Sequence, residues 1–454
     1  MTKGKAWKLI LIFTLPIMAG YLLQQLYSIV DGIIVGNYIS ETAFAAVSTC
    51  QPLTFFYTAL AVGLSVGVGI IVSQNFGAGN ESKLPVVIDT ALILHGACGL
   101  IFTFLGVALS ETLLRHLLNV PEYLIPDAVA YIRVYSIGLV FQFLYNGVAS
   151  TLRGMGDSKA TLYFLLISTV LSTALTFVFI LVIKWGVAGA AFSTVLAQAV
   201  CAAVSYLYLR KRFPYDKSGR HWDRSVAVTM TKLGMPIAIQ LSIVSFGTGT
   251  MQRLVNSFEG TYPGVVAAYG AAIRMDMLVQ VPILGFQSGL ASFTGQNIGA
   301  GKLDRAKRGF LATLIMSTST IIVLSILYNL LAEPIIGFFG LTDDSLRYGI
   351  EQARYMTMCY WIFSVFMSLG GLLQGAGDTI LASAATLSAL AVRIITGYLA
   401  VHLGWLTYSG AWATVPFEWG FELTILYIRF FTGGWKNKAI AGEFSHRDDK
   451  TSPE

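Results

Sequence analysis

The chain has 454 residues, of which 55% are hydrophobic and 12% are charged, and its formal net charge is +6. Soluble domains carry roughly 25% charged residues, so this composition excludes an ordinary soluble protein. Apolar runs of about 20 residues follow one another, and each is long enough to cross a hydrocarbon core about 30 Å thick. A membrane β-barrel would show alternating segments of about ten residues instead. We therefore predict an all-α polytopic membrane protein.

The apolar runs predict twelve transmembrane helices. The first follows Lys3, Lys5 and Lys8, as the apolar part of a secretory signal would, but it is longer than such a segment and no small-residue cleavage site follows it. We expect it to be an uncleaved first span. The predicted spans are 8–36, 44–73, 86–110, 124–152, 160–183, 186–209, 233–257, 265–295, 309–332, 347–374, 380–403 and 407–432.

Lys and Arg residues between the spans predict the orientation, because they are enriched in cytoplasmic loops. An even number of spans places both termini on one side. Most of the 30 Lys and Arg residues fall on that side, whereas the opposite loops hold Arg115, Lys184 and Arg347. We predict that both termini are cytoplasmic. This asymmetry accounts for the positive net charge without a nucleic-acid partner.

An internal repeat is the most informative feature of the sequence. Three motifs recur about 220 residues later in the same order, as expected for a duplicated unit. The pairs are "SQNFGAGNESKL" (73–84) with "GQNIGAGKLDRA" (295–306), "RGMGDSK" (153–159) with "QGAGDTI" (374–380), and "LPI" (15–17) with "MPI" (235–237).

The repeat predicts two lobes of six helices, at 1–209 and 233–432, joined by a basic cytoplasmic linker at 210–232 and followed by a polar cytoplasmic tail at 433–454. Because six is even, the lobes should be related by a pseudo-two-fold axis along the membrane normal. Transporters built this way bind substrate near the midplane and alternate its access. The alternative is that the duplicated bundle is only a stable scaffold.

The Gly-rich repeated segments resemble phosphate-binding loops only superficially. A P-loop requires GxxxxGK[ST] between a strand and a helix, and neither condition is met. We expect these segments to end one helix and turn the chain. The four cysteines lie in predicted spans without metal-ligand spacing, so we interpret them as buried hydrophobic residues and predict no metal site.

Asp31 lies in the first apolar span. A charge at mid-bilayer costs between about 2.5 and more than 10 kcal/mol, so a carboxylate there is expected to have a function. It could load and release a proton, coordinate Na⁺ or attract a cationic substrate. Tyr27 lies one turn earlier on the same face and could hydrogen-bond the acid. A structural, neutral acid bonded to Tyr27 or to another span is the alternative. The position of the second repeat that corresponds to Asp31 is occupied by Met251, so the second lobe has no acid there.

The second lobe contains its own charges within apolar stretches. Two of them are acids one turn apart, so either one is protonated or a base lies between them. Three interpretations of these charges are open: ion pairs between helices, side chains that reach the membrane interface, and a second proton or cation site. The residues of this predicted network are Asp276, Arg274, Arg253, Arg393, Glu418 and Glu422.

Pro16 and Pro236 occupy equivalent helices of the two halves. A proline within a helix removes a backbone hydrogen bond and permits a kink, so both are candidate hinges, with a static kink as the alternative. His95 and His402 stand alone, and we interpret them as structural.

The motifs together resemble the multidrug and toxic compound extrusion (MATE) transporters. The resemblance covers essentially the whole chain, through "VDGIIVGNYISETAFAAVS", "LRGMGDSKAT", "GVAGAAFSTVLAQ" and "GQNIGAGKLDRAKRG". It implies two lobes in a V shape and a secondary antiporter in the bacterial plasma membrane. Such an antiporter would export organic cations and other amphipathic compounds in exchange for H⁺ or Na⁺ by alternating access.

The resemblance also implies site residues. Asp31 corresponds to the family's coupling acid, and Asn146 and Thr194 match further motif positions. The fifth span of the family commonly carries an Asn and an Asp, but here the stretch "LSTALTF" offers Ser172 and Thr176. Na⁺ prefers several hard oxygen ligands and negative charge, so a single carboxylate with hydroxyls favours H⁺. The acid that relatives often carry in span 7 is also missing.

We therefore predict a proton-coupled drug antiporter that is not an enzyme, uses no cofactor besides its coupling ion, and works as a monomer with small-molecule substrates. A flippase for lipid-linked saccharides is the first alternative, although those proteins commonly have fourteen spans and a basic cavity. A membrane-embedded enzyme is a remote alternative, because no nucleophile, metal or cofactor motif is present. A channel is disfavoured because no filter-like repeat occurs.

Overall fold

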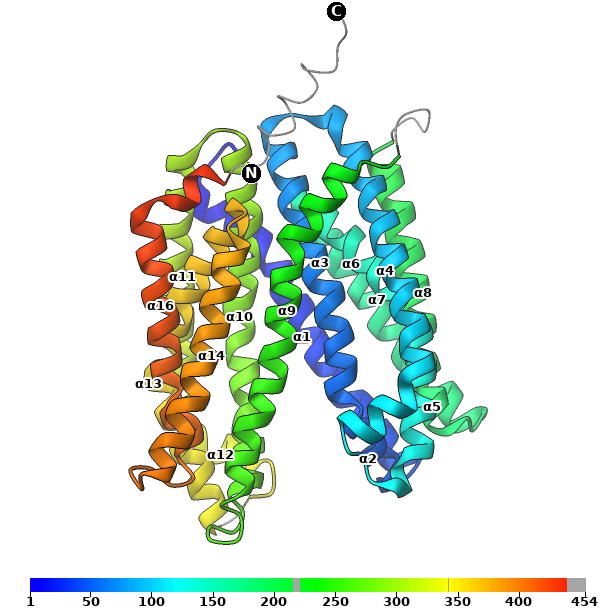
Figure 1. Cartoon of the computed structure of the whole chain (residues 1–454), viewed down its shortest axis with the longest axis vertical. Helices are drawn as coiled ribbons and strands as arrows, with labels where there is room; N and C mark the ends of the chain where they lie inside the picture. The colour runs from blue at the N-terminus through cyan, green and yellow to red at the C-terminus, as the bar shows by residue number, and fades with distance from the viewer. Residues whose placement is uncertain (215–220, 342, 439–454) are drawn as a thin grey trace, which may run out of the picture. The chain divides into compact units, whose positions relative to one another are not determined.

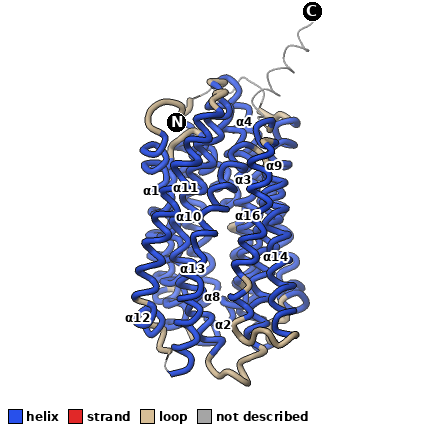
Figure 2. Tube along the Cα trace, turned by 90° about the vertical axis from the view of Figure 1, so that its left-hand side faces the viewer, coloured by secondary structure: helices blue, strands red, loops and turns tan. Residues whose placement is uncertain are grey.

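The computed structural model describes residues 1–214, 221–341 and 343–438. Within these ranges the chain consists of helices and connecting loops, without a strand (Figure 2). The prediction of an all-α chain is therefore confirmed. Residues 215–220 of the predicted linker and 439–454 of the predicted tail lie outside the described residues.

The first half of the chain forms eight helices, several of which run side by side in Figure 1. The predicted span 44–73 is divided into two helices, because Pro52 begins a new helix where its missing amide hydrogen costs nothing. The predicted span 124–152 is likewise broken at Gly138, with a bend of 45°. The helices are α1 (Ala6–Tyr38), α2 (Glu41–Thr49), α3 (Gln51–Ala78), α4 (Leu84–Thr112), α5 (Ile125–Ile137), α6 (Leu139–Gly154), α7 (Ser158–Phe177) and α8 (Gly186–Arg212).

The second half repeats this plan with longer unbroken helices. The predicted last span, 407–432, begins later than expected, because Pro416 starts its main helix after a short turn. The helices are α9 (Arg224–Asn256), α10 (Val265–Gly299), α11 (Leu303–Leu330), α12 (Ala332–Gly337), α13 (Asp343–Ala376), α14 (Thr379–His402), α15 (Gly410–Ala413) and α16 (Val415–Thr432).

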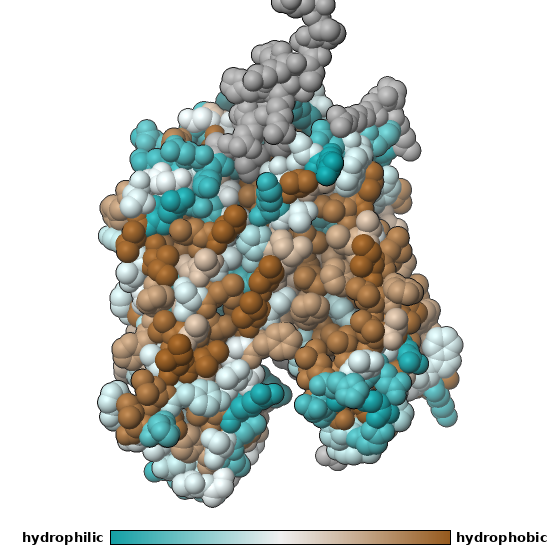
Figure 3. Space-filling view, viewed as in Figure 1, coloured by the Kyte–Doolittle hydropathy of each residue, from teal (hydrophilic) through white to brown (hydrophobic). Residues whose placement is uncertain are grey.

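The described residues contain 10 helical segments long and apolar enough to cross a membrane, or 11 if the bent α5–α6 pair is one span. Helix α16 is not among them; it has 18 residues and carries Glu418, Glu422 and Arg429. On the face seen in Figure 3, apolar residues cover the middle of the helices and hydrophilic residues gather at their ends. This distribution matches a hydrocarbon core bounded by two polar interfaces.

The sequence repeat is also a structural repeat. The Gly-rich segments end α3 and α10, and in each the chain turns at a glycine with positive φ: Gly79 at 75° and Gly301 at 71°. The expectation that these segments are helix ends is therefore confirmed. The aspartates of the second repeated motif, Asp157 and Asp378, are the residues that precede α7 and α14.

Equivalent helix pairs cross through equivalent small residues. A Cβ on Gly154 of α6 would lie 3.0 Å from the carbonyl oxygen of Gly69 on α3. In the second half, a Cβ on Gly375 of α13 would lie 2.3 Å from the carbonyl oxygen of Ala291 on α10. Small residues allow helix backbones to approach closely in lipid, where packing rather than the hydrophobic effect holds helices together.

Close packing at this crossing gives a testable expectation for stability. Gly375→Ala should lower the free energy of unfolding by about 1–3 kcal/mol, because the added methyl group meets backbone that cannot move independently. The thermal midpoint of the detergent-solubilised protein measures this effect. The matched control is Gly270→Ala on α10, where a Cβ meets no atom within 4 Å. Equal midpoints for the two variants would contradict the proposed close contact.

The described chain forms two compact units by internal packing. We call residues 15–242 the N-terminal unit, and residues 1–14 with 243–454 the C-terminal unit. The boundary in α1 falls between Thr14 and Leu15, next to Pro16. The boundary in α9 falls after Ser242, beyond Pro236. The predicted lobe limits at 209 and 233 were drawn from the sequence repeat, and they remain a prediction.

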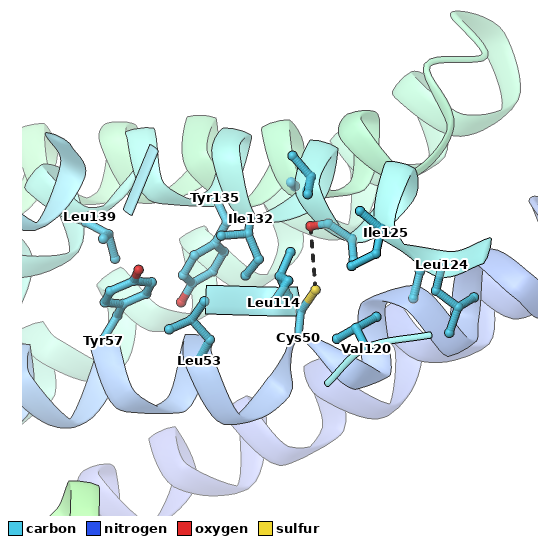
Figure 4. Close-up of a cluster of buried hydrophobic side chains, with 14 residues drawn as sticks. Cys50, Leu53, Tyr57, Leu114, Val120, Leu124, Ile125, Ile132, Tyr135 and Leu139 are labelled. Atoms are coloured by element: carbon cyan, nitrogen blue, oxygen red, sulfur yellow. Dashed lines mark hydrogen bonds between the residues drawn. The ribbon is translucent and has the colours of Figure 1, made fainter. Parts of the chain in front are cut away.

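An apolar cluster holds one end of the N-terminal unit, and its buried members come from α2, α3, α5, the start of α6, α8 and the segment between α4 and α5 (Figure 4). Leu53, Leu114 and Ile132 meet at its centre. The Cys50 thiol donates a hydrogen bond to the carbonyl oxygen of Ala128 at 3.7 Å. All four cysteines are free thiols.

Candidate functional site

Asp31 lies on α1 in the N-terminal unit, and its carboxylate is largely buried. The Thr176 hydroxyl of α7 hydrogen-bonds this carboxylate. The Oδ1 atom is buried and has no hydrogen-bond partner. Asp31 forms no ion pair with any Lys, Arg or His of the described residues. An ionised Asp31 is therefore a buried charge without a protein counterion, which is costly unless a cation binds.

Tyr27 contacts other groups than we predicted. Its hydroxyl lies 2.8 Å from the Ser172 hydroxyl of α7 and 3.0 Å from the Thr194 hydroxyl of α8. The expected hydrogen bond from Tyr27 to Asp31 is therefore wrong, although the two groups share a helix face and interact electrostatically. The physical reason is that two hydroxyls on neighbouring helices already satisfy the phenol.

Three helices thus contribute pairs of polar side chains to one site. Helix α1 supplies Tyr27 and Asp31, and α7 supplies Ser172 and Thr176, each pair one turn apart and so on one face. Helix α8 supplies Ser193 and Thr194, and the Ser193 hydroxyl lies 2.6 Å from that of Thr176. The predicted residues Tyr27, Asp31, Ser172, Thr176 and Thr194 are therefore brought together. Ser193 was missed, although its position beside Thr194 was a usable signal.

Asn146 is placed differently from the expectation. Its amide nitrogen donates to the backbone oxygen of Gln142, one turn earlier on α6, at 2.8 Å. No hydrogen bond joins it to Asp31 within the described part of the chain. A mid-helix amide often bonds its own helix in this way, because an unpaired buried donor would cost more.

Two tyrosines of α5 were not predicted and lie beside the site. Tyr131 interacts electrostatically with Asp31 and Tyr27 and stacks on Tyr135 with ring centroids 6.1 Å apart. The hydroxyl of Tyr135, visible in Figure 4, approaches the Gln142 side-chain oxygen at 3.5 Å. Gln142 in turn donates to the Thr58 hydroxyl at 2.9 Å. Polar groups therefore continue from the Asp31 site toward α6 and α3.

Described apolar side chains also lie beside Asp31. A buried cluster from α1, α2, α8 and the helical turn that follows α7 lies beside the site, and Tyr131 packs against it. Such walls exclude water and strengthen the electrostatic interaction of any bound cation with the carboxylate. The buried members of the cluster are Ile34, Val35, Ala43, Ile180, Val187 and Ala190.

The predicted network of the C-terminal unit is only partly assembled. Arg393 of α14 forms an ion pair with Glu418 of α16 at 3.3 Å, so a base does neutralise one of the two paired acids. The other acid, Glu422, accepts a hydrogen bond from the Thr386 hydroxyl at 2.6 Å. Asp276 lies elsewhere on α10 and is bonded by Tyr360.

Two arginines do not belong to this network. Arg253 and Arg274 are exposed in the C-terminal unit, and no ion pair links either to an acid of the described residues. Their exposure agrees with the alternative of groups that reach the interface and not with a buried ion pair. Sequence position alone does not show which way a helix face turns.

Pro16 and Pro236 lie inside α1 and α9, each a continuous helix of 33 residues. Their role as hinges stays a prediction. His95 is fully buried, and its Nδ1 atom lies 2.8 Å from the backbone oxygen of Ala91. Among the described residues, no group of three or more His, Cys, Asp or Glu side chains is placed to hold a metal ion.

An all-α bundle with many helices long and apolar enough to cross a membrane defines the class: a polytopic membrane protein. The family model described as MatE matches residues 16–178 and, separately, 236–399. The chain belongs to the MATE family of membrane transporters, and it is not an enzyme. Each of the two matched segments covers one copy of the sequence repeat.

Individual relatives agree with this assignment. The chain is 28% identical over 451 residues to the probable multidrug resistance protein YoeA of Bacillus subtilis, covering 97% of this chain and 96% of that one. It is 23% identical over 355 residues to an FAD transporter of Shewanella oneidensis, covering 75% and 76%.

The fold matches solved transporters as well. A multidrug resistance MATE family transporter of the MOP superfamily, in an outward-facing conformation, has a TM-score of 0.86 at 22% identity, covering 97% of this chain and 98% of that one. At this identity the likeness shows the fold, and it supports the architecture of twelve helices in two repeats.

Proposed function

We propose that this protein is a secondary antiporter that exports organic, cationic amphipathic compounds in exchange for H⁺. The observation that supports the proposal is the Asp31 site, where a buried carboxylate lies among hydroxyls and has no protein counterion. Such a group can hold one positive charge at a time, either a proton or a cationic substrate. The relatives named as multidrug resistance proteins support drug efflux.

The composition of the site favours H⁺ over Na⁺. Protonation needs one carboxylate, whereas Na⁺ is held best by several oxygens with net negative charge. Here Ser172 and Thr194 are already occupied by the Tyr27 hydroxyl, and Thr176 by Ser193 and Asp31. The lone pairs of these hydroxyls could still face Na⁺, but only one carboxylate supplies negative charge for it. A proton on Asp31 needs that carboxylate alone and leaves the hydrogen bonds in place.

The transport cycle follows from competition at Asp31. On the outside, where protons are more abundant, Asp31 takes up H⁺ and its attraction for a cationic compound is lost, so the compound leaves. On the cytoplasmic side the proton dissociates and the next compound binds. Because coupling between two ligands is reciprocal, substrate binding must equally promote proton release. We expect α1 to bend near Pro16, where the boundary between the two units crosses the helix.

The cationic preference distinguishes this proposal from its alternatives. A lipid-linked saccharide or a flavin dinucleotide carries negative charge, which an ionised Asp31 would repel. We further propose that the protein acts as a monomer in the bacterial plasma membrane with both termini in the cytoplasm.

Transport in proteoliposomes with separately imposed H⁺ and Na⁺ gradients tests the proposal, with ethidium as the reporter. We expect efflux to follow the H⁺ gradient and to persist when choline replaces Na⁺. A strict requirement for Na⁺ would overturn the ion assignment. Transport of an anionic flavin but not of ethidium would overturn the substrate class.

A further inference from the structure

Asp276 lies on α10 in the C-terminal unit and is only 7% exposed. The Tyr360 hydroxyl of α13 donates a hydrogen bond to its Oδ1 atom. The side-chain nitrogen of Gln352, two turns earlier on α13, lies 3.5 Å from Oδ2. Asp276 forms no ion pair with a Lys, Arg or His of the described residues. The protein therefore buries a second carboxylate that hydrogen bonds hold but no ion pair neutralises.

Two polar atoms near Asp276 have no hydrogen-bond partner. One is the side-chain oxygen of Gln352, a residue that is 2% exposed and whose amide already points at the carboxylate. The other is the hydroxyl of Tyr328 on α11, which is 3% exposed and interacts electrostatically with Asp276. Leaving a buried donor or acceptor unpaired costs about 1–3 kcal/mol. Both atoms could therefore form a further hydrogen bond at this site.

The other ionisable groups around Asp276 do not neutralise it. Arg393 of α14 interacts with Asp276 only electrostatically, without an ion-pair contact, and it is paired with Glu418 of α16. Tyr269, two turns earlier on α10, interacts with both Asp276 and Arg393. Glu333 on α12, which also packs against α10, is exposed. The groups that face the acid are therefore phenols, one amide and a distant, already paired guanidinium.

We propose that Asp276 reversibly binds one proton and forms a second proton site, separate from Asp31. In the ionised state the carboxylate accepts hydrogen bonds from Tyr360 and Gln352. In the protonated state a new O–H bond forms on the carboxyl group, and the Gln352 amide turns so that its oxygen accepts this hydrogen. The hydrogen bond from the Gln352 nitrogen to Oδ2 is exchanged for this new one, no other covalent bond forms or breaks, and the proton, taken from water, is the only species gained. An amide suits both states because it carries a donor and an acceptor.

A proton fits the site better than a metal cation does. The groups nearest the carboxylate, Tyr360 and Gln352, already present hydrogen-bond donors to it. A bound cation would need these groups to turn their oxygen lone pairs inward. Any role of this proton in transport rests on the proposed exchange of H⁺ for substrate. The binding of a proton to Asp276 does not depend on that proposal.

Infrared difference spectra of the reconstituted protein after a pH jump test the proposal, because they report protonated carboxyl groups without requiring transport. We expect Asp276→Asn to remove one carboxylic acid C=O band and to lower proton uptake by one proton per molecule. Asp31→Asn should remove a different band. If Asp276→Asn leaves both the spectrum and the proton uptake unchanged, the second site does not exist, whatever the result for Asp31.

Two further variants complete the experiment. Tyr360→Phe keeps the carboxylate but removes its donor, so the Asp276 band should shift in frequency and persist; an unshifted band would contradict the assignment. This variant also serves if Asp276→Asn fails to fold. Asp304→Asn is the control, because it makes the same chemical change at an exposed position in the first turn of α11 in the same unit. It should leave the bands unchanged. A band that responds to Na⁺ at constant pH would overturn the choice of a proton.

Discussion

Asp31→Asn is expected to abolish proton-driven efflux while the protein remains folded and inserted in the membrane. Asparagine has nearly the same shape and can keep the contact with Thr176, but it can neither bind a proton nor carry a negative charge. Ethidium efflux from proteoliposomes energised by a pH gradient measures the effect. We expect the variant to match liposomes that lack the protein.

The matched control is Asp127→Asn, which makes the same chemical change at an exposed position in the first turn of α5 in the same unit. It should transport like the unaltered protein. The thermal midpoint of detergent-solubilised Asp31→Asn, compared with that of the unaltered protein, separates loss of coupling from loss of folding. Wild-type efflux by Asp31→Asn would exclude the coupling role of this acid.

Arg429→Ala is expected to cause the largest loss of stability among the changes considered. The Arg429 Nε atom of α16 lies 2.6 Å from Oδ2 of Asp378, the residue that precedes α14. The Asp378 side chain is 5% exposed and that of Arg429 is 24% exposed. Removing one partner leaves a buried charge uncompensated, which costs about 3–5 kcal/mol. We expect the lower end, because Arg429 is partly solvated.

The repeat supplies a control for this prediction. At the equivalent position of the first half, the Tyr208 hydroxyl of α8 donates to Oδ2 of Asp157 at 2.8 Å. Asp157 also accepts a hydrogen bond from the Ala160 amide at 3.1 Å. Tyr208→Phe should therefore cost only about 1 kcal/mol, the usual value for a single hydrogen bond. If thermal midpoints show an equal or larger loss for Tyr208→Phe, the ion pair does not have the expected importance.

The two halves thus share their helix arrangement and differ in the polar side chains that they bury. In the first half, Asp157 before α7 binds Tyr208 near the end of α8. In the second half, Asp378 before α14 binds Arg429 near the end of α16. The helix arrangement is the same in both halves because helix crossings and helix starts depend on backbone geometry. The buried acids, Asp31 and Asp276, lie at positions that the repeat does not relate.

The sequence alone determined the features that depend on local chemistry. Apolar runs predicted the spans, because a segment without charges is stable in hydrocarbon only as a helix. The spacing of the repeated motifs predicted two similar halves, and the Gly-rich segments were correctly predicted to end helices. Asp31 was identified as a candidate because a carboxylate is costly within an apolar span. Residues one turn apart, such as Ser172 and Thr176, were correctly placed on one face.

The tertiary structure alone decided which helix faces meet. It joined Tyr27 to Ser172 and Thr194 instead of to Asp31, and it added Tyr131 and Ser193 to the site. It also separated Asn146, Arg253 and Arg274 from the groups with which the sequence had associated them. The physical reason is that the rotation and register of one helix against another depend on packing between segments distant in the chain. Local sequence patterns do not predict which distant segments pack together.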